Sequence, residues 1–266
     1  MNIHFYKTQN PILAKYIEGY YFISEDENIN DIKYWTFPNN YVVFTCNQNI
    51  DVQVNDNHVS IQLSETENLL TSLVPKYTKP ILIHYKQLIN ELTIYFKPLG
   101  INYFTNETDI IFSKEINVDF KLFPDFDEVL LNIFNSSLED KIEILENYLV
   151  SKLQNKDFKL VESILLSIED DFSIQEIAEQ HEISRQYLNK VFKNHVGKSL
   201  SEYRKIHKFR QSIIQQKESK NFTELSQNSF YDQSHFIRSF KDLTAIKPNT
   251  FFKNVDTEKE NIWLFF

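Results

Sequence analysis

Two stretches of the sequence place the same kinds of polar side chain at helical spacing. They are rich in Arg, Lys, Asn and Gln, whose donors and acceptors match the edges of nucleic-acid bases and the oxygens of phosphates. If each stretch is a helix, these side chains lie around its outer face. The first set is Arg185, Gln186, Asn189, Lys190 and Lys193, and the second set is Gln233, Ser234, His235, Ile237 and Arg238. In the second set, the apolar Ile237 could contact a thymine methyl group.

Basic residues are concentrated around these two stretches, although the chain as a whole is acidic. The 266 residues carry a net charge of −9, but residues 184–253 hold 14 Lys and Arg against 5 Asp and Glu. Residues 1–156 carry a net −9 and residues 157–183 a net −7. A compact basic segment is typical of a phosphate-binding surface. A solvated helical surface has the same composition, so charge alone leaves both interpretations open.

Each polar stretch follows the pattern of a shorter helix and a tight turn. Ser173 and Glu176 have the spacing of a capping box at the start of a first helix, and Ser184 is the expected cap of a second. Leu188 and Phe192 fall on one side of that second helix and are expected to hold it against the first. The pattern is that of a helix-turn-helix.

This pattern occurs twice, at a constant offset along the chain. A shift of 48 residues superposes apolar on apolar and small on small positions: Leu188 on Phe236, Phe192 on Phe240, Gly197 on Ala245 and Tyr203 on Phe251. A duplicated helical unit explains this register. Residues 200–216 are expected to form one helix between the copies. Two recognition helices roughly 34 Å apart, one turn of DNA, could enter successive major grooves.

Residues 158–253 resemble the AraC/XylS family of bacterial transcription regulators. The sequence departs from the family where Glu182 and Ala245 replace the usual glycines. The resemblance implies that the two polar sets face double-stranded DNA. The matching stretches are Ile177-Ala178, Ser184, Tyr187-Leu188, Val191-Phe192-Lys193, Gly197, Tyr203, Tyr231 through Arg238, Phe240-Lys241 and Pro248.

The front half of the chain has a different periodicity. From about Lys33 to Gly100, apolar residues alternate with polar ones, which predicts short strands in a small antiparallel sandwich or barrel. Residues 50–54 and 59–63 flank a turn cluster and predict a hairpin. Residues 96–100, Phe-Lys-Pro-Leu-Gly, resemble a motif of a regulator subgroup with a small cupin-like front domain.

A helical period begins after Pro124. One stripe of apolar residues is expected to pack on the sheet or to form a dimerisation surface, and both interpretations stay open. It comprises Leu130, Phe134, Leu138, Ile142, Leu145, Leu149 and Leu153. The chain is thus predicted to be α+β. A β-rich, cupin-like domain with helices at residues 1–156 is followed by an all-α domain with two helix-turn-helix units at 157–254 and a tail at 255–266.

The sequence offers no constellation for catalysis or metal binding. It has no Ser-His-Asp, Cys-His or phosphate-loop pattern. The front half has no His-x-His pair, and Cys46 is the single cysteine. With no apolar run of roughly 18 residues and no secretory signal, a cytoplasmic protein is expected, without a membrane partner. The sequence therefore predicts no enzyme, no cofactor and no metal.

These features predict a DNA-binding regulator controlled through its front domain, by a small-molecule effector or by homodimerisation. Aromatic residues such as Tyr20, Tyr21 and Tyr34 could line an apolar pocket, and core packing explains them equally well. The alternative is a ligand-binding or interaction protein whose helical half contacts a protein partner. The acidic segment 157–183 favours that alternative, whereas the paired recognition helices disfavour it. The apolar residues 261–266 are expected to dock on the front domain or on a second subunit.

Overall fold

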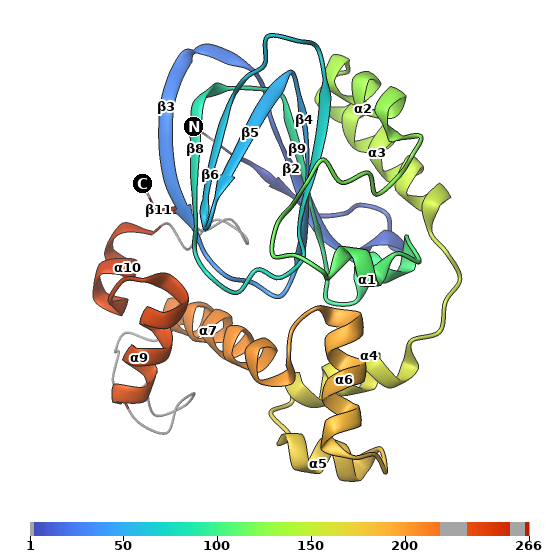
Figure 1. Cartoon of the computed structure of the whole chain (residues 1–266), viewed down its shortest axis with the longest axis vertical. Helices are drawn as coiled ribbons and strands as arrows, with labels where there is room; N and C mark the ends of the chain where they lie inside the picture. The colour runs from blue at the N-terminus through green and yellow to red at the C-terminus, as the bar shows by residue number, and fades with distance from the viewer. Residues whose placement is uncertain (1–2, 219–232, 256–263, 266) are drawn as a thin grey trace.

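The front half of the molecule is built from two β-sheets. The computed structural model describes residues 3–218, 233–255 and 264–265 and places these sheets above a group of helices (Figure 1). The six-stranded sheet has the order β1 (Phe5–Tyr6), β2 (Ile17–Ile23), β9 (Glu91–Phe96), β4 (Val42–Gln48), β7 (Leu69–Val74) and β10 (Asn117–Val118). The five-stranded sheet has the order β11 (Leu264–Phe265), β3 (Asp26–Thr36), β8 (Ile81–Leu88), β6 (His58–Leu63) and β5 (Ile50–Asn55).

Most neighbouring strands are antiparallel, as the alternating sequence pattern predicts, whereas β6 and β8 pair in parallel. The expected hairpin is formed by β5 and β6, with Ile50 opposite Leu63. Asp56 adopts a left-handed φ of 53° at the tip of this hairpin, a conformation that Asp and Asn tolerate better than most side chains.

The six-stranded sheet is covered on both of its faces. Along β4, Val42, Phe44 and Cys46 join a core shared with the helices, whereas Val43 joins a second core between the two sheets. This division follows from the strand period, because successive side chains point to opposite faces. All six residues of β9 are buried for the same reason.

The helices of the front half cover the outer face of the six-stranded sheet. They are α1 (Thr108–Ile111), α2 (Phe126–Asn135) and α3 (Leu138–Lys152). Leu130, Leu145 and Leu149 are fully buried in the same core as Phe44. The apolar stripe predicted from the sequence therefore packs on the sheet, except for Leu138, which is 45% exposed. The buried residues of the stripe are not available as a dimerisation surface.

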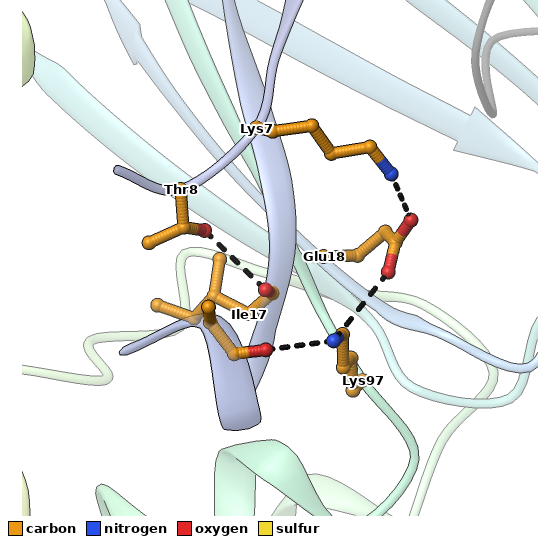
Figure 2. A network of polar contacts seen from close by, with 6 residues as sticks. Lys7, Thr8, Ile17, Glu18 and Lys97 are labelled. Carbon is orange, nitrogen blue, oxygen red and sulfur yellow. Dashed lines mark hydrogen bonds and ion pairs between the residues drawn. The ribbon is translucent and has the colours of Figure 1, made fainter. Parts of the chain in front are cut away.

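The Phe-Lys-Pro-Leu-Gly motif lies at the end of β9 and connects it to the segment around Ala14, Tyr16 and Glu18. Figure 2 shows Lys97 between two neighbouring segments: its Nζ donates to the Ala14 carbonyl at 2.7 Å and lies 3.9 Å from Glu18. Glu18 also pairs with Lys7, so it links the first two strands. A Cβ on Gly100 would lie 2.1 Å from the Tyr16 carbonyl oxygen. Glycine is required there because the two backbones approach so closely.

The back half is helical, so the expected α+β arrangement is confirmed. A third core joins Phe37 of the front half to Phe209, Phe240 and Phe251. The helices are α4 (Lys159–Glu169), α5 (Ile174–Gln180), α6 (Arg185–Val196), α7 (Leu200–Glu218), α9 (Gln233–Thr244) and α10 (Pro248–Asn254).

The end of the chain returns to the front half. Leu264 pairs with Thr36 and Phe265 with Trp35, so β11 extends the five-stranded sheet beside β3 (Figure 1). This pairing confirms that part of the apolar tail docks on the front half of the chain. None of the helices within the described ranges is both long enough and apolar enough to cross a membrane.

The Glu146 carboxylate ties α3 to the N-terminal segment. It accepts hydrogen bonds from the backbone N–H of Gln9 at 2.7 Å, from the N–H of Asn10 at 2.8 Å and from the Tyr20 hydroxyl at 2.7 Å. Burial and the neighbouring carboxylate together raise the pKa of Tyr20 well above its usual range, so this hydroxyl remains a donor.

We expect Glu146→Ala to lower the free energy of unfolding by about 3 kcal/mol, because the buried Tyr20 hydroxyl and two part-buried backbone N–H groups lose their acceptor. Tyr20→Phe removes one of the three hydrogen bonds and should cost only about 1 kcal/mol. Urea unfolding of both variants measures the difference. Equal costs for the two substitutions would contradict the role given to the carboxylate.

Candidate nucleic-acid interface

The first helix-turn-helix consists of α5 and α6. Ser173 and Glu176 form the expected capping box: the Ser173 hydroxyl accepts from the Glu176 N–H at 3.2 Å, and the Glu176 carboxylate accepts from the Ser173 N–H at 2.7 Å. Ser184 caps α6 by accepting from the Tyr187 N–H at 3.2 Å. Ala178 is buried, consistent with a close crossing of the two helices.

The outer face of α6 carries the first predicted set of polar residues. Leu188 and Phe192 are fully buried on the inner face, as predicted. Asn189 is exposed, although its Oδ1 accepts from the Leu200 N–H at 3.3 Å and so also braces the start of α7. The exposed members of the set are Arg185, Gln186, Asn189, Lys190 and Lys193.

The second recognition helix, α9, repeats α6 exactly one period later. It spans Gln233–Thr244, which is Arg185–Val196 shifted by the 48 residues of the sequence repeat. Ile237 and Arg238 are exposed, and Phe240 is buried. Gln233, Ser234 and His235 lie in the first turn of α9, but their side chains are outside the described part of the structure, as is the helix expected around Leu225.

Both recognition helices end in the same way. Gly197 follows α6 with a φ of 77° and donates to the Lys193 carbonyl, and Ala245 follows α9 with a φ of 61° and donates to the Lys241 carbonyl. Glu182, in the turn before α6, also has a left-handed φ of 54°. Glu182 and Ala245 are two of the positions where the sequence departs from the glycines of the AraC/XylS family; a third, Ser229, lies outside the described residues. The backbone keeps its glycine-like conformation at Glu182 and Ala245.

The helix α7 lies between the recognition helices α6 and α9 along the chain. Its 19 residues give a length of about 28 Å, at 1.5 Å per residue. Two ion pairs connect α7 to its neighbours. Lys208 lies 2.9 Å from Asp171, near the first unit, and Lys205 lies 2.9 Å from Asp242 of α9. The recognition helices α6 and α9 lie at opposite ends of α7 (Figure 1).

The front domain holds α7 through contacts that the sequence patterns do not predict. Arg210 of α7 donates from Nε to the Pro38 carbonyl at 2.8 Å and from Nη2 to the Phe37 carbonyl at 3.0 Å. Asn40 donates from Nδ2 to the Tyr203 carbonyl at 3.1 Å. These residues have no periodic or motif signal in the sequence, because their partners are more than 160 residues away along the chain.

Lys198 is a buried cation at the same junction. Its side chain is 1% exposed, and its Nζ donates to the Pro75 carbonyl at 3.4 Å. Burial lowers the pKa of Lys198 to about 7, and the nearby Glu202 carboxylate only partly opposes that shift. The preceding Gly197 packs so closely on Phe112 that a Cβ would lie 2.4 Å from the ring.

Comparison with known proteins agrees with this geometry. A helix-turn-helix domain family matches residues 165–254. The chain is also similar to the uncharacterized HTH-type transcriptional regulator YtdP of Bacillus subtilis, with 24% identity over 187 residues, covering 69% of this chain and 24% of that protein. The chain thus spans about a quarter of the length of this relative.

Among solved structures, ToxT from Vibrio cholerae is similar at 15% identity and a TM-score of 0.47, over 88% of this chain and 96% of that chain. ToxT with a bound unsaturated fatty acid is similar at 16% identity and a TM-score of 0.43, over 87% and 92% of the two chains. The family match confirms the resemblance seen in the sequence. Residues 165–254 form a helix-turn-helix domain of the AraC type.

Glu182 and Ala245, which have left-handed φ angles where the family has glycine, provide a test of the turn geometry. We expect Glu182→Gly and Ala245→Gly each to raise the free energy of unfolding by about 1 kcal/mol, because glycine relieves the steric cost of a positive φ. The control, Gly197→Ala, should lower it through the contact with Phe112. Urea denaturation of the three variants gives the values. A destabilised Glu182→Gly protein would argue against the turn as described.

Lys198 makes stability depend on pH in a defined window. Its pKa is about 7 in the folded chain and 10.5 in an unfolded one, so between these values only the unfolded chain binds the proton. This group therefore makes stability rise with pH from about 7, by up to about 1.4 kcal/mol per pH unit. Below pH 7 both states are protonated and its contribution is flat. Unfolding curves at pH 7, 8 and 9 should show this rise in the wild type relative to Lys198→Met, and parallel pH profiles would refute it.

Proposed function

We propose that this chain is a sequence-specific transcription regulator that reads two successive major grooves of DNA with α6 and α9. The observation that supports this most directly is the 48-residue register of the two recognition helices, each with one buried phenylalanine, Phe192 or Phe240, and exposed residues on the opposite face. The length of α7, about 28 Å, is close to the roughly 34 Å of one turn of DNA. Helices at that spacing meet the same side of the duplex.

The residues of α6 and α9 divide by the chemistry of their side chains. Arg238 and Gln186 present paired donors or acceptors suited to base edges, and Ile237 is suited to a thymine methyl. Lys190 and Lys193 present single charges suited to phosphates. We propose the same DNA-facing role for Arg185, Asn189, Gln233, Ser234 and His235.

We further propose that residues 1–156 control the DNA-binding residues 157–254, through a small-molecule effector or through homodimerisation. The contacts of Arg210 and Asn40 with the front domain support this, because they join α7 to the sheets. A change in the front domain would then change how the recognition helices are presented to DNA. Couplings of this kind are typically 1–3 kcal/mol.

Two substitutions separate base reading from phosphate binding. We expect Arg238→Ala to weaken binding to the preferred sequence by about 1–3 kcal/mol and to relax specificity at one base pair. We expect Lys193→Ala to weaken all sequences alike and to reduce the salt slope by about 1. Fluorescence anisotropy with the DNA upstream of the chain's own gene and with a scrambled duplex, across a salt series, measures both effects.

Lys159→Ala is the matched control for these variants. Lys159 is an exposed lysine of α4 that pairs with Asp157 and belongs to neither recognition helix, and its removal should leave DNA affinity unchanged. If Arg238→Ala and Lys193→Ala bind like the wild type, the recognition faces are wrongly assigned. If the wild type binds both duplexes equally and weakly, either an effector is required for DNA binding or the basic face serves a protein partner instead, and a titration with cell extract added separates the two.

A further inference from the structure

A cavity of about 110 Å³ lies between the two sheets of the front domain. Branched aliphatic side chains from both sheets form most of its wall, among them Val43 of β4, Val59 of β6 and Ile83 of β8. Val54 and Val118 also line it and are 39% and 38% exposed, so they mark its open end. This is space comparable to an apolar cavity of about 150 Å³ that binds benzene in another protein. The size therefore suits a molecule with a single ring.

A buried carboxylate is part of the wall. Glu91 is 1% exposed and accepts from Tyr21 Oη at 2.9 Å, Thr93 Oγ1 at 2.8 Å, Asn47 Nδ2 at 2.9 Å and the Tyr85 hydroxyl. Four donors fill the acceptor capacity of its two oxygens. Of the described residues that line the cavity, none is Lys, Arg or His. An anionic ligand would therefore meet a negative charge without a counterion inside the cavity.

The polar groups of the wall do not favour a cation either. Tyr95 lines the cavity, and burial raises the pKa of its hydroxyl, an effect that Arg210 opposes and Glu91 adds to. The oxygens of Glu91 already accept four hydrogen bonds, so they offer no free acceptor to a cation. A wall of aliphatic and tyrosine side chains is best matched by an uncharged ligand.

We propose that this cavity binds a small uncharged molecule with a single ring, and that its occupancy is transmitted to α7 through Arg210. The route is short. The hydroxyl of Tyr77 donates to Thr36 Oγ1, and both residues line the cavity. Thr36 precedes Phe37, whose carbonyl accepts the Arg210 guanidinium at 3.0 Å. A ligand that displaces Tyr77 or Thr36 acts directly on the segment that anchors α7. This inference rests on the proposed function, because it makes the bound molecule the effector.

Three probes of nearly equal size test the chemical class. Benzyl alcohol, benzoate and benzylamine share a ring and differ in charge, and isothermal titration of the full chain without DNA measures each. We expect benzyl alcohol to bind with a Kd of about 1 mM or lower and the two charged probes at least tenfold more weakly. Tighter binding of benzoate or benzylamine, or no binding of benzyl alcohol, overturns the proposed class. Because no DNA is present, these outcomes are independent of whether the chain reads DNA.

A variant at the open end locates the site. Val118→Trp adds bulk at a partly exposed position, so the fold should tolerate it, and it should abolish binding of benzyl alcohol. Leu63→Trp is the matched control, because Leu63 is 45% exposed and is not among the lining residues. Unchanged binding in Val118→Trp would place the probe elsewhere and overturn the proposal.

The coupling is tested by DNA affinity with and without benzyl alcohol. We expect the probe to change the affinity of the wild type by about fivefold or more and to leave that of Val118→Trp unchanged. Arg210→Met should still bind the probe but lose the change in DNA affinity. If this variant does not fold, as judged by circular dichroism, the wild type and Val118→Trp still decide the outcome. A wild type that binds both benzyl alcohol and DNA, with neither affecting the other, overturns the coupling.

Discussion

The hydrogen bonds of the Arg210 guanidinium join the helical half of the chain to the front domain. This guanidinium lies between α7 and the front domain, and the carbonyls of Phe37 and Pro38 accept its hydrogen bonds. Burial lowers the pKa of Arg210 to about 10, so the side chain remains charged at neutral pH. A buried charge is stabilised only while its acceptors stay in place. The position of α7 therefore depends on the segment that follows β3.

The apolar packing around this contact has the same effect. Phe37 inserts among Phe209 of α7 and Phe251 of α10, with ring centroids 4.9 Å apart for Phe37 and Phe251. At the other end of α7, Tyr203 is buried in the core that contains Phe192 and the six-stranded sheet. The recognition helices α6 and α9 are thus both packed against α7 and the front domain through these cores. Their separation is set by helix length and by side-chain packing together.

The distribution of charge is consistent with an orientation on DNA. The basic residues gather in segment 184–253, whereas residues 1–156 are acidic. Acidic surface is repelled by phosphates, so the field of the protein favours an approach through the basic residues 184–253 and not through residues 157–183, which carry a net −7. A net charge of −9 is in this sense compatible with binding a polyanion.

Local patterns in the sequence were sufficient for much of this structure. Strand alternation predicted the hairpin of β5 and β6, the Ser173 and Glu176 spacing predicted a capping box, and the repeat predicted the bounds of α9 relative to α6. Each of these signals arises within one element or between identical elements. Where the sequence departs from the family glycines, at Glu182 and Ala245, the backbone still adopts a positive φ because the surrounding helices impose it.

The residues that connect the halves emerged only from the folded chain. From the sequence alone, Arg210 is indistinguishable from the other basic residues of its helix, and Lys198 from the other lysines of the basic segment. Glu91 is only the first residue of a strand. Their meaning depends on burial against partners that are distant in the chain, such as Pro38 for Arg210 and Pro75 for Lys198. Periodicity reports which face of an element is apolar, whereas desolvation of a charge depends on everything packed against it. The elements and their repeat were therefore decided locally, and the junction and the cavity by tertiary packing.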